Sequence, residues 1–299
     1  MNNLKNPAIT IVGPGRVGIH LAVLLARNGW SIEQVAGRDR NKLDQAARRL
    51  QSESHLVLIE ELNKPAEVLL LTVSDDAIGA VCEQLAGQGA LDQGTVVFHT
   101  SGACASDLLE PARCLGAAVG SMHPLQTFME SAAGIPDIGG THWFFEGSAR
   151  AGDLAARITA SLGGLFHVIE SEKKVLYHAS AAIACNYMNA VLSAALDCAQ
   201  SADIPRQDMM AALRPLVTTT VENMFNTDPA SALTGPISRG DVETVNKHLE
   251  AMAHSPDLRS LYQALGRIAL EMARSHGMVD ESEAKRLAKS LAQTLESEG

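Results

Sequence analysis

The stretch Pro7-Ala8-Ile9-Thr10-Ile11-Val12-Gly13-Pro14-Gly15-Arg16-Val17-Gly18 decides the fold of this chain. Its first half predicts a short buried strand, and an apolar helix is predicted from about Arg16 to Asn28. A lone G-x-G-x-x-G pattern is a weak signal, but between a strand and a helix it indicates a dinucleotide-binding turn, with a glycine-rich turn that binds no ligand as the alternative. In such a turn the first glycine allows a sharp bend, the second admits a pyrophosphate against the backbone, and the third lets helix and strand pack closely. The free N–H groups of the helix N-terminus then face the phosphates. The predicted cofactor-binding residues here are Gly13, Pro14, Gly15, Arg16, Val17 and Gly18.

The next predicted strand, Ser31–Ala36, indicates which dinucleotide binds. It is followed by Gly37-Arg38-Asp39-Arg40. An acidic residue at this position accepts hydrogen bonds from the ribose 2′-OH of NAD, whereas arginine favours the 2′-phosphate of NADP. Arg38 and Arg40 therefore predict NADP, with NADPH preferred over NADH. Asp39 keeps NAD open as the alternative.

Composition indicates the broad class of protein. The chain has 299 residues, five cysteines and a net charge of −10. This length suggests two domains, and the acidic balance argues against nucleic acid or an anionic membrane as a partner. The first predicted strand leaves no room for a signal peptide, and no uninterrupted apolar run reaches transmembrane length. The cysteines contain no C-x-x-C pair, so we expect reduced thiols, no metal site and a cytoplasmic protein.

The rest of the first half alternates strands with helices, as in a doubly wound parallel sheet. Strands are predicted at 68–73, 95–99 and 117–122, with edge strands at 141–146 and 165–169 around a helix at Ala149–Leu162. Ligands of such sheets bind outside the carboxyl ends of the strands. For any one polar residue at these strand ends, capping of a loop is as good an explanation as a function. Because several of them occur at the same edge of the sheet, the region as a whole is the candidate ligand site. The candidates at these ends are Val73, Ser74, Asp75, Ser101 and Gly102 for the cofactor, and His123 for substrate or catalysis.

After about Ser171 strand patterns disappear and helices are predicted throughout. The predicted helices cover roughly 172–202, 206–226, 241–253, 256–277 and 281–296. We therefore expect an α/β fold with an N-terminal Rossmann domain (1–170) and an all-helical C-terminal domain (171–299) for substrate binding and dimerisation. The role of the second domain is an analogy with proteins of similar fold.

The first of these helices is predicted to carry catalytic groups. Lys174 and His178 are four residues apart, so both can reach the same point. On a helical wheel Cys185, Asn186, Asn189, Ser193 and Asp197 fall in the same broad sector, which suits a cleft or a helix contact better than a solvated face.

A carbonyl or imine that accepts hydride needs a proton at its heteroatom, which an ammonium or imidazolium can supply. The candidates are, in order, Lys174, His178 and His123. For each histidine a structural role is the alternative. Further along, Thr234–Asp241 forms a predicted turn and helix cap that leaves Arg239 either as a surface charge or as a clamp for a substrate carboxylate.

Together these motifs resemble the family in which a Rossmann-like domain precedes a helical domain of unknown function (number 2520), often described as NADP oxidoreductases. The motifs that carry the resemblance are Gly13–Gly18, Val73–Ile78, His99–Gly102, His123–Phe128, the helix with Lys174, Tyr177, His178 and Asn186, and Thr234–Asp241. More distantly the chain is similar to 6-phosphogluconate dehydrogenase, prephenate dehydrogenase, pyrroline-5-carboxylate reductase and ketopantoate reductase.

The resemblance implies a catalytic lysine followed four residues later by asparagine. Lys174 matches the lysine, but His178 stands where the asparagine would be, so Asn186 is the candidate for that role and Asn189 for substrate binding. The reaction it implies first is NADP-dependent reduction of a small 2-keto acid, ketopantoate by preference. The alternatives are an imine reductase, a hydroxyacid dehydrogenase, or an NADP(H)-binding sensor without chemistry. A homodimer is expected by analogy with the fold relatives.

Overall fold

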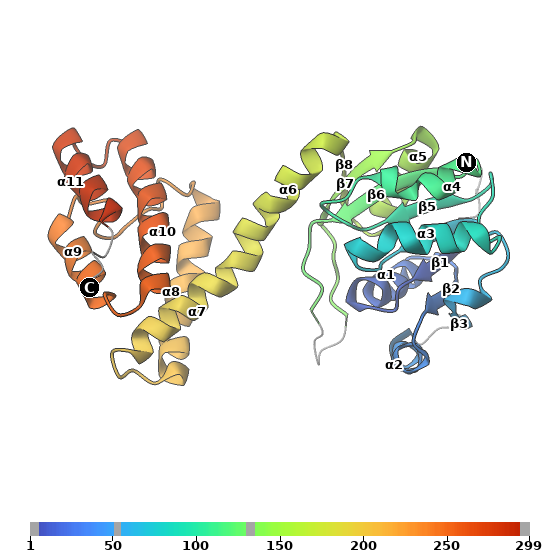
Figure 1. Ribbon diagram of the computed structural model, residues 1–299, viewed down its shortest axis with the longest axis horizontal. Helices are drawn as coiled ribbons and strands as arrows, with labels where there is room; N and C mark the ends of the chain where they lie inside the picture. Colours follow the sequence, from blue (N-terminus) through green and yellow to red (C-terminus); the bar gives the residue numbers. More distant parts are fainter. Residues whose placement is uncertain (1–5, 51–54, 130–134, 294–299) are drawn as a thin grey trace, which may run out of the picture. The chain divides into compact units, whose positions relative to one another are not determined.

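The computed structural model describes residues 6–50, 55–129 and 135–293. They form two compact units that divide between Cys185 and Asn186. In the first unit, strands and helices alternate from β1 to β6, and β7, α5 and β8 follow (Figure 1). Its strands are β1 (Ile9–Val12), β2 (Ile32–Gly37), β3 (His55–Leu58), β4 (Val68–Leu71), β5 (Val96–His99), β6 (Ala118–Pro124), β7 (His142–Gly147) and β8 (Leu165–Val168). Its longer helices are α1 (Arg16–Arg27), α2 (Arg40–Leu50), α3 (Ile78–Gly87), α4 (Glu110–Cys114), α5 (Ala149–Ser161) and α6 (Lys174–Ala181).

The eight strands form one sheet in the order β3-β2-β1-β4-β5-β6-β7-β8. All neighbours are parallel except β6 and β7, which pair antiparallel. The order reverses direction between β1 and β4, which is the point where doubly wound sheets bind their ligands. The predicted Rossmann fold is thereby confirmed.

Helices cover both faces of the sheet. One apolar cluster joins the strands to α1, α2 and α5, and a second joins them to α3 and α4. Strands buried on both faces explain the continuous apolar run Val68–Leu71, in which no residue is more than 1% exposed. Strand β3 (HLVL) was not predicted. It is as short as β1 and β4, but it lies at the edge of the sheet, where none of its residues is buried, and it begins with a histidine instead of an apolar run.

The second unit is helical, as predicted, among its described residues. It contains α7 (Tyr187–Gln200), α8 (Arg206–Asn226), α9 (Val242–Ala251), α10 (Pro256–Ser275) and α11 (Glu281–Ala292). Its core joins α9, α10 and α11 through Val245, Leu249, Leu270 and Leu287. Asp241 caps α9 by accepting a hydrogen bond from Thr244 N (3.0 Å), as expected for the turn before it.

Secondary structure changes from strand to helix between Val168 and Lys174, at the predicted domain boundary of 170/171. The first compact unit nevertheless extends to Cys185. The reason is that α6 packs on the sheet through Lys174 and Tyr177, so the helix begins in the first unit.

The helix through Ser171–Gln200 contains a π-helical segment, Ala182–Asn186. The helical wheel above assumed 100° per residue throughout. Because a π turn holds more residues than an α turn, the angles assigned beyond Ala182 are out of phase with Lys174 and His178, and the single polar sector is wrong.

This helix also bears on the expectation that no apolar stretch reaches transmembrane length. The helix is 30 residues long and contains an 18-residue window with a mean hydropathy of 1.3, so by length and composition alone it could cross a membrane. That is weak evidence, because the core helix of a soluble protein passes the same test.

Candidate functional site

A cavity of about 430 Å³ lies at the carboxyl ends of β1, β2 and β4. The fingerprint turn forms one side of it, and the segments that follow β2 and β4 form the others. Its lining residues are Val12, Gly13, Pro14, Gly15, Gly37, Arg38, Asp39, Lys42, Ile59, Thr72, Val73, Ser74, Ala77 and Val81. The structure therefore brings six of the predicted cofactor residues to one cavity: Gly13, Pro14, Gly15, Arg38, Val73 and Ser74.

The three glycines of the fingerprint have the geometry that their predicted roles require. Gly13 has φ +112°, a conformation that favours glycine. A Cβ on Gly18 would lie 2.1 Å from the carbonyl oxygen of Gly13 and 2.4 Å from Thr72 Oγ1, so only glycine fits beneath the turn. A Cβ on Gly15 would meet nothing within 4 Å. This open backbone at the N-terminus of α1 is where a phosphate fits.

Two cations and one carboxylate line the ribose end of the cavity. Arg38 and Lys42 lie there with Asp39, and all three are exposed. Arg40, the second predicted arginine, begins α2 and does not line the cavity. The Asp39 carboxylate accepts a hydrogen bond from Asn41 N (2.9 Å) and so also caps α2. Lys42 was missed because the predicted nucleotide site ended at Arg40, the first residue of α2, and did not extend further into that helix.

A second group of polar side chains gathers at the carboxyl ends of β5 and β6. Lys174 is fully buried there. Its Nζ donates to Ser121 Oγ (2.7 Å) and to the carbonyl oxygen of Ser101 (3.2 Å), which also accepts from Ser121 Oγ (3.1 Å). Burial lowers the pKa of the Lys174 ammonium, as expected for a partly desolvated lysine. In this position Lys174 ties the turn after β5 to β6, and its two observed partners are both protein groups.

His99, the last residue of β5, stabilises the turn at Ser101. It is fully buried, its Nδ1 accepts from Ser101 N (3.2 Å), and its Nε2 lies 3.1 Å from the carbonyl oxygen of Ala105. Burial lowers the pKa of His99 to about 4, so the ring is neutral at neutral pH. His99 belongs to one of the motifs quoted above, but no role was predicted for it.

The imidazole rings of His123 and His178 meet over Gly102. We call these two rings, with Lys174, Tyr177 and the turn Ser101–Gly102, the histidine group. A Cβ on Gly102 would lie 2.4 Å from His178 Nδ1 and 2.9 Å from His123 Nε2, so the absence of a side chain makes their approach possible. The rings are 5.6 Å apart and nearly perpendicular. Within the part of the chain that the structure describes, His178 Nδ1 is buried without a hydrogen-bond partner. Lys174 and His178 thus both reach the turn at Ser101–Gly102, as their spacing predicted.

His123 is held by Tyr177, a residue for which no role was predicted. Its Nδ1 lies 2.8 Å from Tyr177 Oη. Burial, His178 and Lys174 lower the pKa of His123 to about 4, in that order of importance, while Asp75 opposes the shift. Asp75 therefore contributes to the electrostatics of this group although it does not line the nucleotide cavity.

The remaining predicted residues do not line the nucleotide cavity. Arg16, Val17 and Gly18 begin α1 without lining the cavity, and Ser101 and Gly102 belong to the histidine group. Asn186, Asn189 and Arg239 belong to the second unit and are exposed there.

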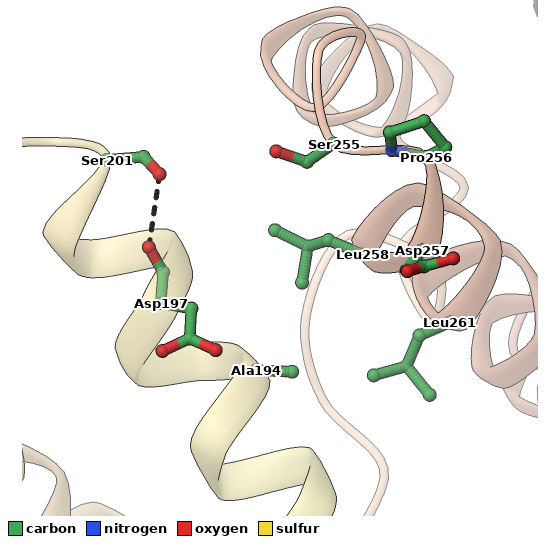
Figure 2. Close-up of a pocket in the computed structure, with 8 residues that line it drawn as sticks. All are labelled: Ala194, Asp197, Ser201, Ser255, Pro256, Asp257, Leu258 and Leu261. Atoms are coloured by element: carbon green, nitrogen blue, oxygen red, sulfur yellow. Dashed lines mark hydrogen bonds between the residues drawn. The ribbon is translucent and has the colours of Figure 1, made fainter.

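The second unit has a cavity of its own, of about 360 Å³, between α7 and the start of α10 (Figure 2). Leu258 and Leu261 point from α10 toward α7, on which Ser201 Oγ donates to the carbonyl oxygen of Asp197 (3.1 Å). Arg206 pairs with the Asp197 carboxylate (2.7 Å). None of the predicted catalytic or substrate residues lines this cavity.

Two family models match consecutive parts of the chain. The Rossmann-like domain matches residues 3–124, and the domain of unknown function DUF2520 matches residues 141–269. The chain therefore carries a Rossmann-like domain followed by a DUF2520 domain, as its motifs indicated. No curated protein matches the sequence.

Solved structures share the fold over most of the chain. A protein from Bacteroides fragilis, named "putative NADP oxidoreductase", is 23% identical, with a TM-score of 0.74 over 89% of this chain and 99% of its own. The protein TM1727 from Thermotoga maritima is 22% identical, with a TM-score of 0.70 over 90% and 99%. A reductive aminase from Aspergillus terreus, in complex with NADPH and ethyl levulinate, is 16% identical, with a TM-score of 0.58 over 95% and 99%.

Proposed function

We propose that this chain is an NADP-dependent oxidoreductase that transfers hydride to or from a small carboxylate-bearing substrate. The observation that carries the proposal is the coincidence, at the carboxyl edge of one sheet, of a fingerprint cavity and a pair of imidazole rings. The first suits a dinucleotide, and the second suits the heteroatom of a carbonyl or imine. The names of the B. fragilis protein and of the aminase support the same class.

The residues of the cavity fit NADP(H). The open backbone at Gly15 and the free N–H groups of α1 suit the pyrophosphate. Arg38 and Lys42 supply two cations for the 2′-phosphate, where Asp39 alone would favour the 2′-OH of NAD. The nicotinamide, when bound, supplies or accepts the hydride.

We assign the transfer of a proton to the substrate to the histidine group. As hydride reaches the substrate carbon, the oxygen or nitrogen beside it gains a lone pair and takes up a proton. His178 Nδ1 and His123 Nε2 lie together at Gly102. A protonated His178 can transfer the proton to that atom, while the neutral His123 can stabilise it with a hydrogen bond. Lys174, the first candidate from the sequence, is engaged with Ser101 and Ser121, so we assign it the role of holding the turn.

The substrate we propose first is a 2-keto acid such as ketopantoate. Arg239 is our candidate for binding a substrate carboxylate, and Asn186 and Asn189 are further candidates for substrate binding. An imine reductase or a hydroxyacid dehydrogenase is the second candidate, because the fold is shared with a reductive aminase whose structure contains NADPH and a keto ester. We further propose that the enzyme is a cytoplasmic homodimer without nucleic-acid or membrane partners.

The test is oxidation of NADPH and NADH by the purified chain with ketopantoate, other 2-keto acids and cyclic imines. Turnover with NADPH that falls at least about tenfold in His178→Asn, while the variant keeps its NADPH affinity, supports the proposal. NADPH binding without turnover of any member of the panel would instead indicate the sensor. Failure to bind either nucleotide would overturn the proposal.

A further inference from the structure

Tyr177 is held on three sides at the edge of the histidine group. Its Oη lies 2.8 Å from His123 Nδ1, and its ring is 4.3 Å from that of Phe144. Phe144 on β7 is the direct strand partner of His123 on β6. Tyr177 lies on α6 three residues after Lys174, and the Lys174 ammonium donates a hydrogen bond to Ser121. The hydroxyl is thus directed at one ring nitrogen by neighbours on both the helix and the sheet.

The direction of this hydrogen bond follows from the protons available. Burial raises the pKa of Tyr177, so the phenol keeps its proton. His123 is neutral near pH 7 because burial lowers its pKa, and a neutral imidazole has one N–H and one lone pair. Oη has His123 as its one hydrogen-bond partner among the described residues. Both groups are satisfied when Tyr177 donates and Nδ1 accepts, which leaves the imidazole proton on Nε2.

The position of His123 Nε2 allows its proton to be donated in a hydrogen bond at Gly102. Nε2 lies beside the bare Cα of Gly102, where a Cβ would be 2.9 Å away, and next to the unpartnered Nδ1 of His178. We infer that Tyr177 is a positioning residue that fixes His123 as its Nε2–H tautomer, so that His123 donates a hydrogen bond to the carbonyl oxygen or imine nitrogen of the substrate at Gly102. The use of this N–H rests on the proposed function, whereas the tautomer itself does not.

The test is a tautomer measurement on the ligand-free full-length chain labelled with ¹⁵N at histidine. Long-range ¹H–¹⁵N correlations distinguish a ring nitrogen that bears a proton from one that does not, and His123→Asn identifies the His123 signals. In the wild type at pH 7.5 we expect a protonated Nε2 and an unprotonated Nδ1. Tyr177→Phe removes one hydrogen bond, so the ratio of Nε2–H to Nδ1–H should fall by about tenfold.

The chain offers a matched control. Tyr262 Oη lies 2.9 Å from His248 Nδ1 in the second unit, with the two rings perpendicular as in the first pair. Tyr262→Phe should change the His248 signals and leave those of His123 in place. If the reductase activity is established, Tyr177→Phe should lower kcat about tenfold with little change in KM for NADPH, while Tyr262→Phe should change neither.

A wild-type His123 with its proton on Nδ1 would overturn the inference, and so would a tautomer ratio unchanged in folded Tyr177→Phe. The wild-type spectrum decides the first point even if that variant does not fold. Neither result depends on turnover, so failure of the inference is distinguishable from failure of the proposed function.

Discussion

The nucleotide cavity and the histidine group are built in different ways at the same edge of the sheet. The cavity is built around the backbone of a contiguous turn, of which Gly13, Pro14 and Gly15 line it. The histidine group is made of side chains that are distant in sequence: Lys174 meets Ser101 over 73 residues and Tyr177 meets His123 over 54. A site made of backbone depends on where glycine occurs, whereas a site made of side chains depends on packing. The following predictions test this contrast.

The largest effect is expected at Gly18. Gly18→Ala places a methyl group against the carbonyl oxygen of Gly13, so the turn must move and we expect a loss of roughly 3 kcal/mol in the free energy of unfolding. Gly15→Ala is the matched control, because its methyl group meets open space at a φ of −83° that alanine adopts. Chemical denaturation measures both variants.

The two glycines should separate stability from binding. Gly15→Ala should keep the free energy of unfolding within about 0.5 kcal/mol while weakening NADPH binding at least about tenfold, since the methyl group occupies the space of the phosphate. Equal stability of the two variants would contradict the backbone account of this turn.

Lys174 tests whether the histidine group depends on a buried tie. Lys174→Ala removes two hydrogen bonds and leaves a cavity, so we expect a loss of about 2–3 kcal/mol in the free energy of unfolding. The neighbouring Lys173 is exposed and paired with Glu170, and Lys173→Ala should change stability little. A Lys174→Ala protein as stable as the wild type but without turnover would instead restore Lys174 as the proton donor.

These two regions also explain what could be predicted from the sequence. Strands β1, β2 and β4–β8 were foreseen because buried parallel strands read as apolar runs ended by glycine or polar residues. The glycine roles were foreseen because they are local. The missed features were β3, the π-helical segment and the partners of Lys174. Each depends on pairing, helix phase or packing, which periodicity does not contain.

Arg38 and Lys42 illustrate the boundary between the two cases. Arg38 follows a strand directly, so its position was predictable. Lys42 reaches the same cavity only because α2 begins at Arg40, which places Lys42 in the first turn of the helix. The sequence shows three cations after β2, namely Arg38, Arg40 and Lys42. The residue at which α2 begins decides that Arg38 and Lys42 line the cavity and that Arg40 does not.

A smaller effect is expected from pH. His99 and His123 have pKa values of about 4 in the folded chain against 6.5 for an ordinary histidine. The unfolded chain therefore binds more protons between pH 6.5 and 4, so stability is complete above pH 6.5 and falls as the pH decreases. Each ring should contribute a loss of roughly 2 kcal/mol between pH 7.5 and 4.5. Chemical denaturation of the wild type and of His99→Asn at pH 7.5 and pH 4.5 measures the contribution of His99. If the free energy of unfolding fell equally in both proteins between these pH values, the burial of His99 in its neutral form would be contradicted.

The central claim, that the fingerprint cavity binds NADP(H) through Arg38 and Lys42, is tested most directly by calorimetric titration of NADPH and NADH. The wild type should bind NADPH more tightly. Arg38→Ala and Lys42→Ala should each weaken NADPH binding about tenfold and change NADH binding little, and Arg40→Ala should leave both affinities unchanged. Equal affinity of the wild type for the two nucleotides, or a loss confined to Arg40→Ala, would contradict the account.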